Sequence, residues 1–479
     1  MHYTAKQVND QCNLVKRFLK QGKVHEAVGA FVEVAIAEPS VAWCSDNIPC
    51  DDNKEFHRLL CEHLMAIYPQ LDYRVRLYSL WERLLCDRGS QETIDELKKL
   101  SQILPNNQFI VTMFAYAYNK IGFYKTSLYY CKRLEQDFIG SGFMAYDQKS
   151  IDFMEYLEID CLYELGEFHK MLDKIESLDN DSEYMCIMRI LAYRGLRMFD
   201  EAVAEAESFL CLNKSADVRF FHGHILYLKG RMDLAYDDFC HIIENNPESI
   251  YTPFCMAYLG EEEAAIELSQ KRARDSSFNK FIKAEILSLT GKLDEAYNIL
   301  KEHLMSPDSS EKGRTGLLFD PALQRLLLEG NGIELVNDHI SQIEKRDEEE
   351  LRGLMSRKEQ HKGKRIELPY SIDGLLKVIT LRVDGVEAHF LWAPSSERTV
   401  LSNIFKNDGT HHFLHRSREF GELMVSEGSA NINIGGWNIE KQSVLFCDNM
   451  EICILGGDIL SKAQAINTDT SKLLITITI

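Results

Sequence analysis

The sequence predicts a multidomain fold, in which an all-α helical-repeat solenoid is followed by a small all-β domain. One short phrase recurs about every 33 residues up to about residue 310, and from Arg365 onward the pattern alternates as strands do. A highly charged stretch separates the two regions. We expect the solenoid in residues 1–310, capping helices in 311–341, a charged linker in 342–363 and the β domain in 364–479.

The recurring phrase runs from a Gly, through a large apolar residue and an acidic or polar residue, to a residue that is usually small. It reads Gly-Lys-Val-His-Glu-Ala at Gly22–Ala27 and returns at Gly230–Ala235 and Gly291–Ala296. Most intervals between successive closing residues of this phrase are 30 to 34 residues. One doubled interval indicates a degenerate repeat near residues 40–72, and one long interval indicates an insertion near 137–148. About nine units result. Apart from the degenerate one, their closing residues are Ala27, Thr93, Ser127, Met171, Ala202, Ala235, Ala265 and Ala296.

Each unit has a physical explanation as a helix pair. Gly ends the first helix because it adopts the left-handed conformation at low cost. The small residue lets the second helix lie close to the first. Pro then ends several units because it cannot continue a helix, and these residues are Pro39, Pro105, Pro247 and Pro307.

These phased phrases resemble the tetratricopeptide repeat family over about residues 8–308. By this resemblance the first helix of each pair lines a concave face that binds proteins or peptides. The implied partner-binding residues are Tyr116, Tyr156, Asp160, Tyr163, Phe220, His224, Tyr227, Phe281 and Glu285. Aromatic rings with interleaved acids suit a peptide that offers apolar and basic groups. The alternative is that several of these aromatic rings pack between repeats.

The charge of the chain restricts its partners. There are 54 Lys and Arg against 74 Asp and Glu, a net charge of −20. Residues 364–479 contain 11 basic and 14 acidic residues, so residues 1–363 carry 43 and 60, a net charge of −17. This field repels phosphate backbones and favours a basic protein partner over nucleic acid. The acidity is also explained by solubility alone.

Cysteine usage and hydropathy indicate the compartment. The 13 Cys are scattered without a CxxC pair, which argues against a zinc site and against a disulfide scaffold. His411, His412 and His415 have no acid or Cys beside them to complete a metal site. No apolar run long enough for export or for a membrane span is visible. We therefore expect a cytoplasmic protein with no metal and no cofactor.

The C-terminal region is predicted to be all-β. Asp384-Gly385 between two apolar runs is typical of a tight hairpin. The predicted strands are Val378–Val383, Val386–Trp392, Glu422–Val425, Ala430–Ile434, Gln442–Cys447, Glu451–Leu455 and Leu473–Ile479. We expect the last of them to be an unshielded strand through which two copies form a homodimer. The alternative is that it pairs within its own sheet.

Two phrases in this region resemble the single-lobe aspartic peptidases of retroviral type. The first is Ala388–Ser396, and the second is Ile-Cys-Ile-Leu-Gly-Gly-Asp-Ile-Leu at Ile452–Leu460. In that family an apolar strand leads into Asp-Thr-Gly, and the second phrase packs behind it. Here Ala393 occupies the position of the catalytic Asp and is followed by Pro394 and Ser395. A methyl group can neither hold a proton nor polarise water, so the resemblance implies a lobe without catalytic residues.

These observations predict a protein-binding adaptor or scaffold. Its acidic helical groove captures a protein or peptide, and its inactive peptidase-like lobe dimerises or binds a peptide. The alternative is an active aspartic endopeptidase whose solenoid selects the substrate. A sensor whose lobe binds a small ligand is a third reading.

Overall fold

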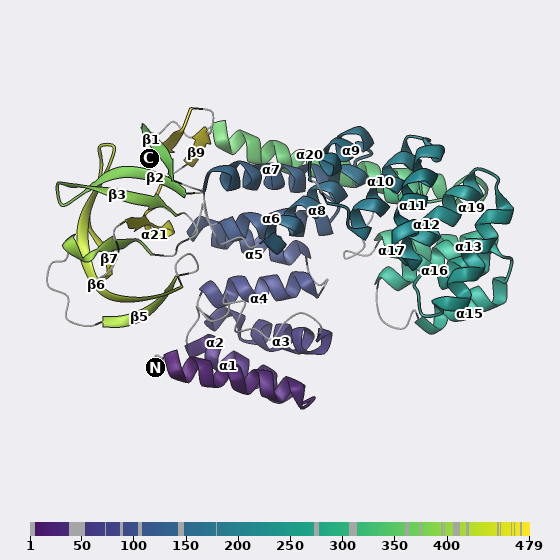
Figure 1. Ribbon diagram of the computed structural model, residues 1–479, viewed down its shortest axis with the longest axis horizontal. Helices are drawn as coiled ribbons and strands as arrows, with labels where there is room; N and C mark the ends of the chain where they lie inside the picture. Colours follow the sequence, from purple (N-terminus) through teal and green to yellow (C-terminus); the bar gives the residue numbers. More distant parts are fainter. Residues whose placement is uncertain are drawn as a thin grey trace. The chain divides into compact units, whose positions relative to one another are not determined.

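The computed structural model describes residues 5–37, 53–71, 73–86, 90–103, 108–141, 148–178, 180–272, 277–305, 314–359, 364–373, 376–393, 396, 398–405, 412–417, 421–447, 450, 452–460, 462–463, 465–469 and 472–479. A long series of helices precedes a β domain (Figure 1). The predicted fold class is therefore confirmed. No helix in these ranges is long and apolar enough to cross a membrane.

The repeat region is built from consecutive short helices. Their bounds are α1 (Ala5–Lys20), α2 (Val24–Ala37), α3 (Lys54–Ala66), α4 (Tyr73–Leu85), α5 (Ser90–Ile103), α6 (Gln108–Lys120), α7 (Tyr124–Ser141), α8 (Gln148–Glu164), α9 (Phe168–Ser177), α10 (Glu183–Gly195), α11 (Phe199–Leu212), α12 (Ala216–Leu228), α13 (Met232–Asn245), α14 (Thr252–Tyr258), α15 (Glu262–Arg272), α16 (Ser277–Leu289) and α17 (Leu293–Met305).

The closing residues of the sequence phrase mark the helix pairs. Each lies near the start of a second helix, in α2, α5, α7, α9, α11, α13, α15 or α17. All eight are fully buried, including the one large exception, Met171. The described residues thus contain eight pairs in the predicted phase. Helix α3 stands between the first two pairs, in the region of the expected degenerate repeat, and the rest of that region lies largely outside the described residues.

The turns inside the pairs explain the recurring Gly. Six of these turns have a Gly with positive φ, between 71° and 82°, and these are Gly22, Gly122, Gly166, Gly230, Gly260 and Gly291. A side chain would be strained in this conformation. Arg197 takes the same position between α10 and α11 with φ 60°, so the turn geometry is kept where the Gly is missing.

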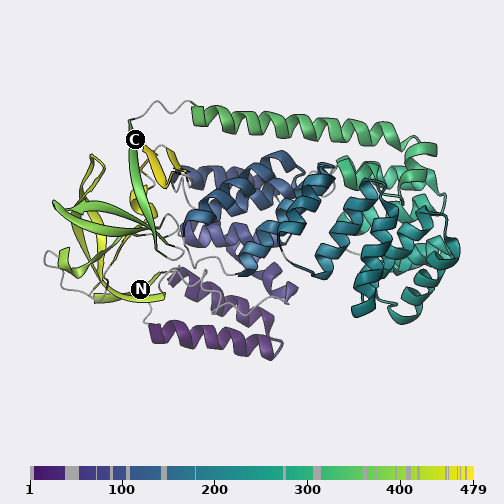
Figure 2. The same cartoon turned by 45° about the horizontal axis from the view of Figure 1, so that its top comes forward.

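Among the described residues, three more helices follow the pairs: α18 (Arg314–Leu318), α19 (Gln324–Glu329) and α20 (Gly332–Glu359). Helix α20 is one continuous helix of 28 residues (Figure 2). It runs through the predicted boundary between the capping helices and the charged linker. Helix α19 packs on α16 and α17, and its residues Leu326 and Leu327 belong to their apolar core.

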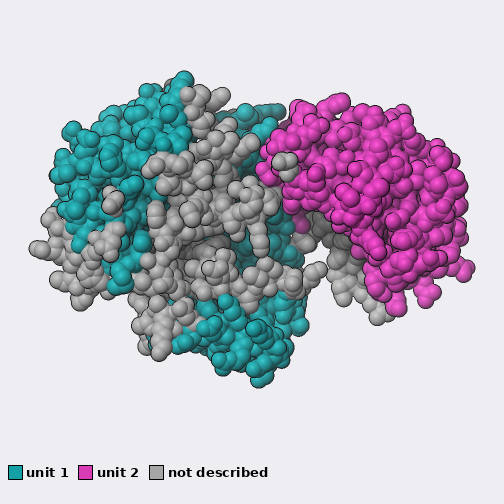
Figure 3. Space-filling view, in the orientation of Figure 1, with its two compact units in different colours: residues 1–118, 129–154, 352–479 teal, residues 119–128, 155–351 magenta. Residues whose placement is uncertain are grey.

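The chain separates into two compact units (Figure 3). Unit 1 contains residues 1–118, 129–154 and 352–479, and unit 2 contains residues 119–128 and 155–351. Most of helices α8 to α20 therefore belong to unit 2, whereas unit 1 contains the first helices and the β domain.

In the part of the β domain that the structure describes, ten strands form one sheet. They are β1 (Arg365–Asp373), β2 (Leu376–Val383), β3 (Val386–Trp392), β4 (Val400–Ser402), β5 (His412–Ser417), β6 (Gly421–Ile434), β7 (Trp437–Cys447), β8 (Cys453–Leu455), β9 (Ala465–Asp469) and β10 (Leu474–Thr478). The order is β5-β6-β7-β4-β8-β3-β2-β1-β10-β9, and β6 also pairs with β2, which curls the sheet toward a barrel. The predicted hairpin at Asp384-Gly385 is confirmed as the turn between β2 and β3.

Two predicted runs, Glu422–Val425 and Ala430–Ile434, are parts of the single strand β6. The sequence pattern divided the strand because the residues between the two runs are polar. They still belong to the strand, because their backbone groups pair with β7 whatever their side chains are. Strands β1, β4, β5 and β9 were not predicted.

The expectation that the last strand is unshielded is wrong. Strand β10 lies between β1 and β9, and it pairs antiparallel with both. Ile475 and Ile477 are fully buried in the core of the domain. Because the backbone groups of this strand already have partners on two sides, it offers no open edge to a second copy.

Candidate functional site

Four aromatic rings form a cluster in unit 1, which we call the aromatic patch. Trp81 comes from α4, Phe109 and Tyr116 from α6, and Phe153 from α8. The Trp81 ring centroid lies 5.7 Å from those of Phe109 and Tyr116 and 5.9 Å from that of Phe153. Tyr116 and Phe153 are 5.2 Å apart. All four side chains are half-buried, so they pack together while part of each ring remains accessible.

These helices are the first helices of three successive pairs, the face that the sequence predicted to bind partners. The sequence named only Tyr116 among the four residues. Trp81, Phe109 and Phe153 come from different repeats, and they meet only through the packing of those repeats. Phe109 and Tyr116 are seven residues apart on one helix face, and that spacing could have identified Phe109.

In unit 2, Tyr156, Asp160 and Tyr163 lie half-buried along α8. The hydroxyl of Tyr184, on α10, donates a hydrogen bond of 2.7 Å to Asp160 Oδ1. Removal from water raises the pKa of Asp160 to about 6, against the hydrogen bond from Tyr184 and the charge of Lys120, which lower it. Arg194, near the end of α10, donates to the Tyr163 hydroxyl at 3.0 Å. The structure thus joins α8 to α10 through polar contacts.

Four of the predicted residues are buried inside unit 2. Phe220, His224, Phe281 and Glu285 expose at most 6% of their surface. Phe220 stacks on Tyr251 at 4.3 Å, and Phe281 contacts the ring of His303. For Phe220 and Phe281 this burial fits the alternative that aromatic rings pack between repeats, because first-helix side chains also fill that space. His224 and Glu285 are buried beside them and do not line an open surface. For the other five residues, partner contact stays a prediction.

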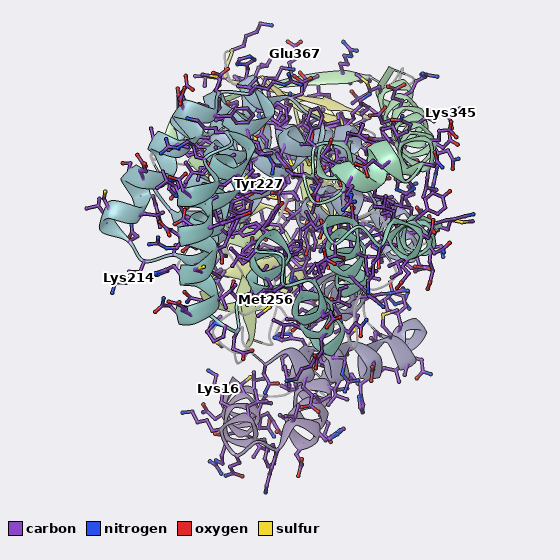
Figure 4. The ribbon with its side chains drawn as sticks, turned by 90° about the vertical axis from the view of Figure 1, so that its right-hand side faces the viewer. Lys16, Lys214, Tyr227, Met256, Lys345 and Glu367 are labelled. Carbon is purple, nitrogen blue, oxygen red and sulfur yellow. The ribbon has the colours of Figure 1, made fainter. Side chains whose placement is uncertain are left out.

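His224 is neutral in this environment. Burial lowers the pKa of its imidazole to about 3; the charge of Arg194 lowers it further, and Asp320 opposes both. Its Nε2 lies 3.3 Å from the hydroxyl oxygen of Tyr258. Tyr227, the half-buried residue of α12 labelled in Figure 4, has its ring 4.9 Å from that of Tyr258. These contacts pack α12 against α14.

In the β domain, the two phrases that carry the peptidase resemblance lie side by side. Strand β3 pairs in parallel with β8, with Trp392 opposite Leu455. The backbone N–H of Ala393 donates to the Leu455 carbonyl at 3.1 Å. Ala393 is fully buried in an apolar cluster with Leu391, Val400, Val425, Leu445, Cys447 and Ile454. Pro394 and Ser395 lie outside the described residues. Ala393 therefore brings no polar group to this position.

The second phrase has a structural carboxylate, Asp458. Its Oδ1 accepts a hydrogen bond of 2.7 Å from the Thr399 hydroxyl, and that hydroxyl accepts one from the Gly456 N–H. A Cβ at Gly456 would lie 2.6 Å from the Arg398 carbonyl oxygen, so only Gly fits there. Burial raises the pKa of Asp458, while its hydrogen bonds and Arg398 lower it. Asp458 thus fixes the loop before β4.

A surface pocket of about 720 Å³ lies between the β2–β3 and β6–β7 hairpins. Its polar lining residues include Arg382, Glu387, Asn433 and Lys441. The β2–β3 turn precedes β3, whereas Ala393 follows it. The pocket therefore lies at the opposite end of this strand from the peptidase-like position.

No protein-family model matches the sequence, and no curated protein matches it. Among solved structures, the chain is similar to a retropepsin-like aspartic protease from Rickettsia conorii, at 17% identity and a TM-score of 0.20, over 24% of this chain and 91% of that one. It is similar to the APC/C hetero-tetramer Cut9-Hcn1 at 13% identity and a TM-score of 0.35, over 68% of this chain and 65% of that one. A tetratricopeptide repeat protein from Parabacteroides merdae is similar at 12% identity and a TM-score of 0.28, over 67% of this chain and 98% of that one. With TM-scores this low, none of these similarities says what the chain does.

Proposed function

We propose that this chain is a protein-binding scaffold whose repeats hold a protein or peptide partner. The aromatic patch carries this proposal. Half-buried Trp and Tyr rings supply much contact area at little cost in conformational entropy, and they dominate the binding energy of protein interfaces. Three successive first helices present the patch, which is the arrangement of a peptide-binding face in a helical solenoid.

We propose further that the partner contains basic and apolar groups. The net charge of −17 over residues 1–363 attracts such a partner and speeds its association at low salt. An Arg or Lys of the partner would also be attracted to the face of Trp81 or Tyr116. The scattered cysteines support a reducing compartment, and we propose the cytoplasm.

The β domain of the proposed scaffold has no peptidase activity. A general base at the expected position requires a carboxylate, and Ala393 places a methyl group there in an apolar cluster. Asp458 is engaged with Thr399 and supports the loop. Both observations support a binding or structural role for this domain.

A peptide-display library panned against the full chain tests the proposal. We expect enrichment of peptides with basic and aliphatic residues, and at least a tenfold loss of affinity in Trp81→Ala. Tyr236→Ala is the matched control, because Tyr236 is 40% exposed on α13, away from the patch residues in sequence. Circular dichroism verifies that both variants keep their helices.

Two results would count against this function. One is a library that yields no peptide above background. The other is a set of selected peptides that bind Trp81→Ala as tightly as the unaltered chain, while that variant remains folded.

A further inference from the structure

A short segment after the last helix pair returns to the beginning of unit 2. We call residues Thr315–Asp320 the inserted segment. The N–H of Gly316 donates a hydrogen bond of 2.9 Å to Glu164 Oε2, and Glu164 is the last residue of α8. The Thr315 hydroxyl lies 3.5 Å from the Glu164 carbonyl oxygen. The partners in these contacts are about 150 residues apart in sequence, so they are not contacts between neighbouring repeats.

The middle of the inserted segment makes apolar contacts. Leu317 is fully buried in the core cluster of the later repeats. The ring of Phe319 stands edge-on to that of Phe168, at the start of α9, with 6.3 Å between centroids. Phe319 nevertheless remains 47% exposed. The apolar contacts that hold the segment against the rest of unit 2 are thus made by Leu317 and Phe319.

The far end of the segment carries a carboxylate. Burial lowers the pKa of His224, and the Asp320 charge opposes this effect. Burial raises the pKa of Tyr258, and the Asp320 charge adds to this effect. Asp320 Oδ1 accepts a hydrogen bond of 2.9 Å from Ala322 N–H, which fixes the chain at the end of the segment. After Asp320 the chain continues to α16, where Leu326 N–H donates to Ser288 Oγ at 3.2 Å. The segment therefore contacts the first pair of unit 2, and helix α19, which follows it, contacts the last pair.

The inserted segment is not itself a repeat. It contains only part of α18, a helix of five residues, and lacks the Gly-to-Ala phrase that begins each second helix. It contacts the last residue of α8 and the first residue of α9, and it places Leu317 in the apolar core of the later repeats. Peptides bind protein surfaces in the same way, through backbone hydrogen bonds and side chains that fill pockets. The sequence of the inserted segment is Thr-Gly-Leu-Leu-Phe-Asp, that is, two small residues, two leucines, an aromatic residue and an acid.

We propose that this surface of unit 2 is a peptide-binding site, and that the inserted segment is its resident intramolecular ligand. A partner segment with two leucines and an aromatic residue before a carboxylate competes for the same surface. Because the resident segment is tethered, its effective concentration is about millimolar. A free peptide of equal intrinsic affinity therefore binds the unaltered chain weakly, and binding strengthens when the resident contacts are removed.

A fluorescein-labelled peptide with the sequence of residues 314–322 tests this competition by fluorescence anisotropy against the full chain. The double variant Leu317→Asn and Phe319→Ser weakens the resident segment, and we expect it to bind the peptide at least tenfold more tightly than the unaltered chain does. Leu328→Asn is the matched control, because Leu328 is 78% exposed in the neighbouring helix. A peptide that carries the same two substitutions should not bind.

Equal peptide affinity in the double variant and the unaltered chain, with helical circular dichroism retained, overturns the proposal. A second measurement keeps the test valid if the double variant unfolds. In the unaltered chain, excess peptide should speed hydrogen exchange at the Gly316 N–H several-fold, because it displaces the segment from Glu164. Unchanged exchange at saturating peptide also overturns the proposal.

Discussion

The carboxylate of Asp347 accepts hydrogen bonds from two backbone N–H groups in the first turn of helix α7, about 222 residues earlier in the chain. Its Oδ2 lies 2.8 Å from Lys125 N, and its Oδ1 lies 3.0 Å from Thr126 N. Both N–H groups belong to the first turn of α7, where no intrahelical acceptor exists. Asp347 is 3% exposed and comes from α20, so the cap is supplied by a distant helix of unit 2.

Asp347→Ala should destabilise unit 2 by about 1–2 kcal/mol, because it leaves two N–H groups without their acceptor. Urea unfolding followed by circular dichroism measures the change. Glu349→Ala is the matched control, since Glu349 is exposed two residues further along α20. Equal unfolding midpoints for the two variants would show that the cap contributes nothing.

Asp160 should make unit 2 less stable as the pH rises from about 4 to about 6. Its pKa of about 6 is above the ordinary value, so in this window the folded protein binds a proton that the unfolded chain has released. The stability from this group is fully present below pH 4 and is lost above pH 6. Asp160→Asn, which needs no ionisation, should raise the unfolding midpoint at pH 7.5 and change it little at pH 4.

The control for this pH dependence is Asp173→Asn, at an exposed position on α9. It should leave the difference between the two pH values unchanged. If Asp160→Asn lowers the midpoint at pH 7.5 instead, the ionised carboxylate stabilises the fold, and the assignment of its raised pKa is wrong.

Two Gly→Ala substitutions should act in opposite directions. A Cβ at Gly195, the last residue of α10, would lie 2.4 Å from the Phe168 ring, and this overlap should cost about 1–3 kcal/mol. Gly29 is exposed inside α2, with no atom within 4 Å of a Cβ. Gly29→Ala should therefore stabilise its helix by about 0.5–1 kcal/mol. Thermal unfolding compares them, and a shift of the same sign for both would contradict the packing at Gly195.

Ala393→Asp should not create a peptidase. A carboxylate at this fully buried position in an apolar cluster would destabilise the β domain unless it remained protonated. We expect a lower thermal midpoint that partly recovers at acid pH, and no cleavage of denatured casein. Ala393→Val, an apolar substitution at the same position, separates the cost of charge from the cost of volume. Cleavage by the Asp variant would show that Ala393 faces a working cleft in solution.

The sequence predicted those features that depend on local conformation. The left-handed turns at Gly22 or Gly230 follow from one residue type, and the buried Ala residues follow from the repeat phase. The aromatic patch, the Asp347 cap and the hydrogen bond from Gly316 N–H to Glu164 were not predicted. Each joins helices from different repeats or from distant parts of the chain, and no periodicity in sequence specifies which of them meet. For the same reason, the sequence left open whether Phe220 and Phe281 line a groove or pack between repeats, and they are buried.

The Asp347 cap and the inserted segment also constrain how the chain can be made. A solenoid whose repeats contact only their neighbours can fold one repeat at a time while it leaves the ribosome. Here α7 receives its cap, and α8 its partner Gly316, only after residues 315–347 have been synthesised. At about 5–20 residues per second, roughly 8–45 seconds pass between the synthesis of α7 and α8 and the synthesis of these partners. During that time the first turn of α7 lacks the Asp347 carboxylate, and the Glu164 carboxylate lacks the Gly316 N–H.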